Sequence, residues 1–133
     1  MDVEEFFNRL NAGETNFAGV DLRGACLIGS DVRDINLSGA ELRNADLTDV
    51  DLARVNLMGA NLSGAILLNA NLEYAILVGA DLSGADLDGT NFENADLSNG
   101  NLRNAIIGNV RDAILCNTIM PNGRIANDGC GGG

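Results

Sequence analysis

The sequence repeats every five residues from Thr15 to Asn109, and this period constrains the fold more than any other feature. In an α-helix, residues five apart lie about 140° from one another around the axis, so the repeated side chains would scatter over the cylinder. A helical bundle is therefore excluded. One large apolar residue marks each of the nineteen repeats: Phe17, Leu22, Leu27, Val32, Leu37, Leu42, Leu47, Leu52, Leu57, Leu62, Leu67, Leu72, Leu77, Leu82, Leu87, Phe92, Leu97, Leu102 and Ile107.

Each repeat also carries a small residue two positions before the large one, mostly alanine, usually with Asn or Asp between them. Inward side chains two residues apart are typical of extended chain. Two positions after the large residue stands Gly, Asn or Asp in seventeen of nineteen repeats, the exceptions being Arg54 and Tyr74. These residue types reach positive φ at low cost, as the third position of a type II turn requires. We therefore predict a short extended segment and a corner in each repeat.

Several repeats read Ala, then Asp or Asn, then Leu: Ala45-Asp46-Leu47, Ala60-Asn61-Leu62, Ala70-Asn71-Leu72, Ala80-Asp81-Leu82, Ala85-Asp86-Leu87 and Ala95-Asp96-Leu97. Over two thirds of its length the chain resembles the pentapeptide-repeat proteins, whose motif is A(D/N)LXX, and residues 12–17 look like the entry segment of cyanobacterial members. The resemblance implies an all-β fold, a right-handed quadrilateral parallel β-helix with four repeats per coil. Because this family shares a scaffold rather than a chemistry, the resemblance indicates little about function.

Residues 1–14 are predicted to form a short N-terminal capping α-helix that covers the first coil. Asp2 is the expected N-cap, and Glu5 stands at capping-box spacing. The helix would shield the Phe17 layer and leave no bare strand edge there. Its apolar face consists of Val3, Phe6, Phe7 and Leu10.

After the β-helix of residues 15–109 the register breaks. Treating residues 110–112 as three extra residues restores the pattern, so that residues 113–117, 118–122 and 123–127 fit it again. We predict an irregular C-terminal coil or cap over 110–127, with Pro121 near an edge or corner because proline lacks a ladder donor. Residues 128–133, which end in Gly-Cys-Gly-Gly-Gly, are expected to be a disordered tail.

The composition argues against catalysis. The chain has no histidine, which removes the commonest general base and metal ligand. Asp31 and Asp51 are expected to stack as a carboxylate pair, and such a pair can raise a pKa or attract a cation, but on a convex side rather than in a pocket. We predict no enzyme activity, no cofactor and no metal site.

Composition also bounds location and partners. The net charge of −11 opposes direct binding of nucleic acid. No apolar run approaches the ~18 residues of a membrane helix, and the acidic N-terminus lacks the features of a secretion signal, so a cytoplasmic location is expected. The odd number of cysteines, Cys26, Cys116 and Cys130, without ligand spacing, predicts reduced thiols.

With four repeats per coil, every twentieth residue shares a face, and two adjacent faces hold most of the negative charge. This acidic side comprises Asp31, Asp46, Asp49, Asp51, Glu73, Asp86, Asp88 and Glu93. A solvated surface is the simpler interpretation. The alternative is mimicry of DNA, which the resemblance implies through fluoroquinolone-resistance members that bind gyrase, although B-DNA, with one charge per ~1.7 Å, is more densely charged.

A second unusual surface is the corner patch of Met58, Tyr74, Ile76 and Val78, which is apolar where the repeat elsewhere prefers polar residues. Ile66 and Leu68 add apolar groups on the opposite face. Exposed apolar groups of this kind indicate contact with something, unless the protein's own termini cover them. We therefore predict a non-catalytic scaffold for an unidentified protein partner, with a regulatory role and a homodimer left open. The alternative is a DNA mimic that inhibits or protects DNA gyrase or topoisomerase.

Overall fold

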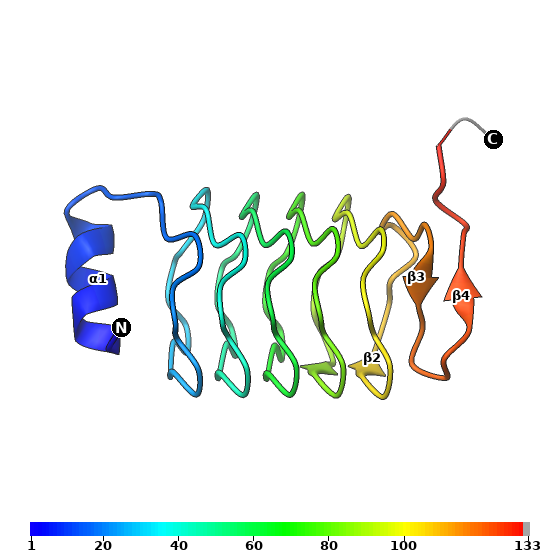
Figure 1. The fold of residues 1–133 in the computed structure, drawn as a ribbon, viewed down its shortest axis with the longest axis horizontal. Coiled ribbons are helices and arrows are strands. Elements are labelled where there is room, and N and C mark those ends of the chain that lie inside the picture. Colours follow the sequence, from blue (N-terminus) through cyan, green and yellow to red (C-terminus); the bar gives the residue numbers. More distant parts are fainter. Residues whose placement is uncertain (132–133) are drawn as a thin grey trace.

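The computed structural model describes residues 1–131, which form one elongated stack of coils (Figure 1). Helix α1 (Val3–Asn11) lies across one end of the stack. Strands β1 (Asp86–Leu87) and β2 (Ile106–Ile107) belong to the last regular coils, and β3 (Thr118–Ile119) and β4 (Ile125–Ala126) lie at the far end. The two ends of the chain are therefore at opposite ends of the molecule.

Successive coils are joined by parallel bridges between residues 20 apart. In one column Asn16 bridges Asn36, Asn36 bridges Asn56, and Asn56 bridges Ile76. The Leu57 N–H donates to the Ile76 carbonyl at 2.7 Å, and the Asn56 N–H donates to the Ile35 carbonyl at 3.1 Å. A separation of 20 residues corresponds to four five-residue repeats per coil. The chain is thus a repeat β-solenoid in which each coil contacts its neighbours only.

The corners have the backbone conformation that the sequence predicts. The Ala60 N–H donates to the Leu57 carbonyl at 3.0 Å across a turn whose third residue, Gly59, has φ 67°. The two exceptions to the turn pattern, Arg54 and Tyr74, adopt the same left-handed conformation, each with φ 60°. In nearly every repeat the tertiary fold imposes this conformation, whatever residue stands there.

The Asn or Asp of each repeat has a structural role that the sequence analysis missed. Its side-chain oxygen accepts a hydrogen bond from the backbone N–H two residues later, as from Met58 to Asn56 at 3.0 Å and from Ser83 to Asp81 at 2.9 Å. This Asx turn fixes the start of the corner, and Asn and Asp form such a turn more readily than Ser and Thr do. The A(D/N)L pattern therefore encodes the turn as well as the surface.

The interior is a column of leucines beside a column of alanines, and Leu62 and Ala65 are fully buried. Two small inward positions hold threonine instead. The Thr90 hydroxyl donates to the Leu67 carbonyl and the Thr118 hydroxyl to the Leu97 carbonyl, each at 2.8 Å. These bonds satisfy both hydroxyls, so the dry interior holds no unpaired polar side chain within residues 1–131.

The predicted N-terminal cap is confirmed. Asp2 is the N-cap of α1, and its side chain accepts a hydrogen bond from the Glu5 N–H at 2.7 Å. Phe6 is completely buried and packs edge-on against Phe17, with ring centroids 4.9 Å apart. The guanidinium of Arg9 lies over the Phe17 ring, with its Cζ 5.1 Å from the ring centroid. The helix therefore closes the first coil.

The last coil is two residues shorter than the regular coils, so residues 110–112 replace a five-residue repeat instead of adding three residues to the pattern as we expected. Ile114 bridges Asp96 and Ile119 bridges Asn101, so residues in this coil stack 18 apart rather than 20. Residues 123–127 fit the repeat pattern in the sequence, but they do not add another repeat above the coil. Gly123 is left-handed (φ 85°), one position later than the corner pattern requires, so the chain reverses and β4 pairs antiparallel with β3. Pro121 lies in this reversal, as expected.

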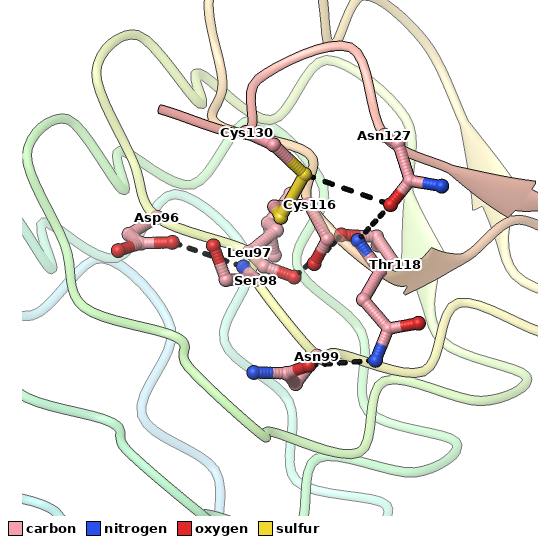
Figure 2. The surroundings of a disulfide bond; sticks show 9 residues. Asp96, Leu97, Ser98, Asn99, Cys116, Thr118, Asn127 and Cys130 are labelled. Atoms are coloured by element: carbon pink, nitrogen blue, oxygen red, sulfur yellow. Dashed lines mark hydrogen bonds between the residues drawn. A yellow bond between two sulfur atoms is a disulfide. The ribbon is translucent and has the colours of Figure 1, made fainter. Parts of the chain in front are cut away.

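The prediction of three reduced thiols is also wrong, because Cys116 and Cys130 form a disulfide (Figure 2). The odd number of cysteines was a weak argument, since Cys26 alone is free and exposed. The disulfide also changes the account of the expected tail 128–133: the Gly129 N–H donates to the Leu115 carbonyl at 2.9 Å, which ties residues 129 and 130 to the last coil. Residues 132–133 of that tail lie outside the described residues.

Candidate interaction surfaces

The corner patch is assembled from two successive coils. Met58 and Val78 occupy equivalent positions one coil apart, and the Gly59 N–H donates to the Val78 carbonyl at 2.9 Å. Ile76 stands in the same repeat as Val78, and Tyr74 is at the corner that leads into it. Exposed fractions are 54% for Tyr74, 49% for Met58 and 39% for Ile76. The fold therefore stacks Met58 beside Val78 in successive coils, with the exposed Tyr74 and Ile76 in the same stretch of chain as the half-buried Val78.

Tyr74 is the least expected residue of this patch because it is a bulky residue at positive φ. A left-handed conformation costs a non-glycine residue roughly 1–2 kcal/mol, and large side chains are genuine outliers there. The equivalent residue one coil earlier, Arg54, also has φ 60°, but its guanidinium donates to Asp34 at 2.6 Å. Tyr74 has no hydrogen bond of this kind among the described residues. The corner hydrogen bonds impose this conformation, and residues held in strained conformations cluster at functional sites.

Other exposed apolar residues lie apart from the corner patch. Ile66 bridges Asp46 below and Asp86 above, on the column that carries part of the acidic side. Leu68 follows in the same repeat and is half-buried, while Ile28 is 53% exposed two coils earlier on the same face. These residues alternate with polar ones, so they do not form a continuous apolar area.

The acidic side contains both neutralised and free carboxylates. Asp31 bridges Asp51 as expected, but Arg33 lies between them, with its Nη2 2.8 Å from Asp31 Oδ2 and its Nε 3.4 Å from Asp51 Oδ2. The hydrogen bond from Arg33 lowers the pKa of Asp31, which is opposite to the rise that two bare carboxylates would cause. This pair is therefore an ion-pair network rather than a cation site.

The other carboxylates of the acidic side form no ion pair within residues 1–131; they are Asp46, Asp49, Glu73, Asp86, Asp88 and Glu93. Asp46 and Asp86 are Asx-turn residues, accepting from the N–H of Thr48 and Asp88 at 3.1 and 3.2 Å. Part of the negative charge thus follows from the turn chemistry. No group of three or more Cys, Asp or Glu side chains in the described chain is arranged to hold a metal ion.

The pattern of the pentapeptide repeat family, "Pentapeptide repeats", matches residues 7–39, 35–73 and 65–104, in eight copies. This range coincides with the coils joined by 20-residue bridges. The chain belongs to the pentapeptide-repeat family. A comparison with curated protein sequences found no significant match.

Solved structures of other pentapeptide-repeat proteins are similar to this one. The protein Rfr23 from the cyanobacterium Cyanothece 51142 is 28% identical, with a TM-score of 0.60 over 83% of this chain and 89% of that one. A protein from the thylakoid lumen of Arabidopsis thaliana is 32% identical, with a TM-score of 0.61 over 80% of this chain and 72% of that one. A protein from Nostoc PCC 7120 is 28% identical, with a TM-score of 0.52, over 84% and 93%.

In this pentapeptide-repeat protein several surface residues lie outside the shared motif. The motif accounts for the leucines, the alanines and the Asx residues, whereas Tyr74, Met58 and Ile76 are additions to it. Among residues 1–131, no helix has the length and apolar character needed to cross a bilayer.

Proposed function

We propose that this pentapeptide-repeat protein is a non-catalytic scaffold whose corner patch, Met58, Tyr74, Ile76 and Val78, contacts a protein partner. The right-handed quadrilateral cross-section expected from the family is part of this proposal, because such a prism would present the patch on a rigid edge. One observation carries the proposal: Tyr74 is left-handed and 54% exposed, and its hydroxyl forms no hydrogen bond among the described residues. A partner that packs on the ring would provide a compensating contact.

The patch has the composition that protein interfaces favour. Tyr and Met are enriched at interface centres, and a tyrosine ring buries a large area with few rotatable bonds. The neighbouring backbone is held by inter-coil hydrogen bonds such as Leu57 to Ile76, at 2.7 Å. Little conformational entropy would therefore be lost when a partner binds.

The test compares the same substitution, isoleucine to aspartate, at two exposed positions. Ile76→Asp places a charge inside the patch, while Ile28→Asp places it on another face, where Ile28 is 53% exposed. Each protein is immobilised and exposed to an extract of its native organism, and retained proteins are quantified. We expect one protein to be retained by the wild type and by Ile28→Asp but lost from Ile76→Asp, since a buried unpaired carboxylate is costly.

Self-association is measured in parallel, because a second copy could cover the patch. If light scattering gives a dimer for the wild type and a monomer for Ile76→Asp, the partner is another copy of the chain. If both variants retain the same proteins and have the same mass in solution, the proposal is wrong.

The free carboxylates of the acidic side support a second candidate, a DNA mimic that acts on gyrase or topoisomerase. Asp88 and Glu93 are exposed and unpaired among the described residues. A supercoiling assay with micromolar protein tests this candidate. Inhibition or protection that weakens in Asp88→Asn with Glu93→Gln, and that falls with salt, would favour it. An absence of any effect on supercoiling removes it.

The cytoplasmic location predicted from the sequence is also part of the proposal, and the Cys116–Cys130 pair gives a direct test. Disulfides persist in oxidising compartments and are rare in the cytosol. Intact native cells are treated with an alkylating agent before lysis, and labelled cysteines are identified by mass spectrometry. Label on all three cysteines supports the cytoplasm, whereas label on Cys26 alone contradicts it.

A further inference from the structure

The C-terminal end of the solenoid is hollow, whereas its N-terminal end is closed by α1. An open hollow of about 1110 Å³ lies between the last coil and the β3–β4 hairpin. Its apolar lining includes Ile107, Leu115, Met120 and Ile125. Such a volume is slightly above the range of about 300–1,000 Å³ that is typical of small-molecule sites. The hollow is remote from the corner patch and independent of the function proposed above.

One strand edge beside the hollow is unpaired. Strand β2 pairs with β1 on the side that faces the N-terminal end of the stack. Within residues 1–131 no segment pairs with its other side, which faces the C-terminal end. By contrast, β3 is bridged on both sides, to Asn101 and to β4. Ile106 of β2 is 60% exposed. An unpaired edge of this kind accepts an extended peptide, which adds backbone hydrogen bonds to the ladder.

The charge around the hollow is opposite to that of the rest of the protein. Residues 1–102 contain 17 Asp and Glu and five Arg, whereas residues 103–133 contain two Asp and three Arg. The five arginines of the first group all form ion pairs. Arg103, Arg111 and Arg124 form none within residues 1–131, although unpaired carboxylates are abundant in the chain.

These three arginines surround the same end of the molecule. Arg111 and Arg124 line the hollow itself, and Asp128 is the single carboxylate in its lining, so two positive charges face one negative charge there. Arg103 extends toward the hairpin turn, where its guanidinium lies beside Gly123. Guanidinium groups with unused donors are well suited to carboxylates, which they bind with two parallel hydrogen bonds.

We infer that this hollow binds an extended acidic segment of another protein, which pairs with β2 and places its carboxylates near Arg111 and Arg124. The bound segment would stack on β2 as one repeat of a further coil would. Its two inward side chains, two residues apart, would lie above Ala105 and Ile107 and continue the apolar columns, so the segment carries apolar residues at alternate positions.

A second copy of this chain fits the hollow less well. Two copies joined through their hollows would bring Arg111 and Arg124 of both copies together, and like charges repel. The N-terminal end of another copy offers acidic residues, but among residues 1–14 no large apolar side chain is exposed to fill the hollow. Charge and shape together therefore favour an acidic, alternately apolar peptide.

The probe is a fluorescein-labelled peptide with the sequence of residues 80–89, Ala-Asp-Leu-Ser-Gly-Ala-Asp-Leu-Asp-Gly, which has the required pattern. A control peptide carries Asn in place of each Asp and keeps the repeat motif. Binding to the intact protein is measured by fluorescence polarisation, and the contact is located by amide chemical shifts. We expect saturable binding of the acidic peptide with shifts at Ile107 and Gly108, and at least about tenfold weaker binding of the Asn peptide.

Protein variants separate the hollow from general electrostatics. Arg124→Glu is expected to weaken binding of the acidic peptide by at least about tenfold. Arg43→Glu makes the same charge change at an exposed position elsewhere, where Arg43 pairs with Glu41, and should leave binding unchanged. Ile76→Asp should also bind normally, which distinguishes failure here from failure at the corner patch.

Three results would overturn the inference. Binding that is absent or unsaturable at ~1 mM peptide is too weak for a specific site. Equal loss of binding in Arg124→Glu and Arg43→Glu would mean that only net charge matters. A wild-type dimer that dissociates in Arg124→Glu, seen by sedimentation velocity, would make the hollow a contact between copies of this chain.

Discussion

The two ends of this solenoid face the same physical problem and solve it differently. A stack of parallel coils exposes an apolar layer and unpaired backbone at each end. At the N-terminal end α1 covers the layer with Phe6, which is fully buried against Phe17. At the C-terminal end a hairpin and a disulfide cover part of the last coil and leave a hollow. Complete closure gives stability, whereas incomplete closure leaves a surface that can bind.

Removing the N-terminal closure should have the largest effect. Phe6→Ala deletes a buried aromatic side chain and is expected to lower the free energy of unfolding by about 3–5 kcal/mol, measured by urea denaturation. Phe7→Ala is the control, because Phe7 is only partly buried and should cost less. Equal losses in the two variants would mean that α1 does not close the first coil through Phe6.

Removing the Cys116–Cys130 disulfide at the C-terminal end should have a somewhat smaller effect. Cys116→Ser removes a cross-link between residues 14 apart and is expected to cost about 3 kcal/mol in oxidised protein. Cys26→Ser changes an exposed free cysteine and should be nearly neutral. Hydrogen exchange should accelerate at Leu115 and Gly129 in Cys116→Ser. If a reductant leaves the unfolding of the wild type unchanged, the disulfide does not hold this end.

The middle coils provide a reference for both ends. In these coils we expect one substitution to increase stability. Tyr74→Gly relieves the left-handed strain and should raise the free energy of unfolding by roughly 1 kcal/mol, while weakening contact with any partner of the corner patch. Arg54→Gly should gain less, because it also loses the ion pair with Asp34. A destabilised Tyr74→Gly would show that the tyrosine ring packs on its own coil and stabilises it.

Low pH should have the smallest of these effects on stability, and it should destabilise the N-terminal end more than the C-terminal end. Hydrogen bonds from Arg23 lower the pKa of Asp21 to about 2, and Arg33 and Arg54 lower the pKa values of Asp31 and Asp34. A lowered folded-state pKa contributes stability that is complete above the ordinary value of 3.8 and is lost as pH falls toward about 2.

All three carboxylates belong to residues 21–34, near the N-terminal end. Hydrogen exchange of the first coil should therefore accelerate below pH ~4 before that of residues 113–119, where no described carboxylate is ion-paired. Uniform acceleration along the chain would contradict this order.

Much of the fold could be predicted because the five-residue period states the inward positions and the corners directly, whereas the coil length of four repeats was implied by the resemblance to the family. The capping helix was also predictable, since Asp2 and Glu5 have capping spacing and Phe6 lies on the apolar face. The reversal at Gly123 was not predictable, because residues 123–127 fit the repeat and differ only in where the left-handed residue falls.

The surfaces were less predictable than the core. The corner patch followed from arithmetic on the repeat, yet the strain at Tyr74 required its backbone angle. The disulfide between Cys116 and Cys130 could not be predicted, because it depends on how residues 127–130 fold back onto the last coil and no local sequence pattern indicates that. The hollow exists because residues 1–131 place no further coil above β2, and its charge became evident only when the ion pairs of the other arginines were known.

The 20-residue coil has a consequence for how such chains change in length. Loss or duplication of one repeat keeps every leucine in the interior, but it rotates all downstream surfaces by a quarter turn relative to those upstream. Loss of four repeats restores the original alignment and only shortens the molecule. Small insertions could thus reshuffle which exposed groups face the same direction without disturbing the core, whereas whole-coil insertions would conserve that arrangement.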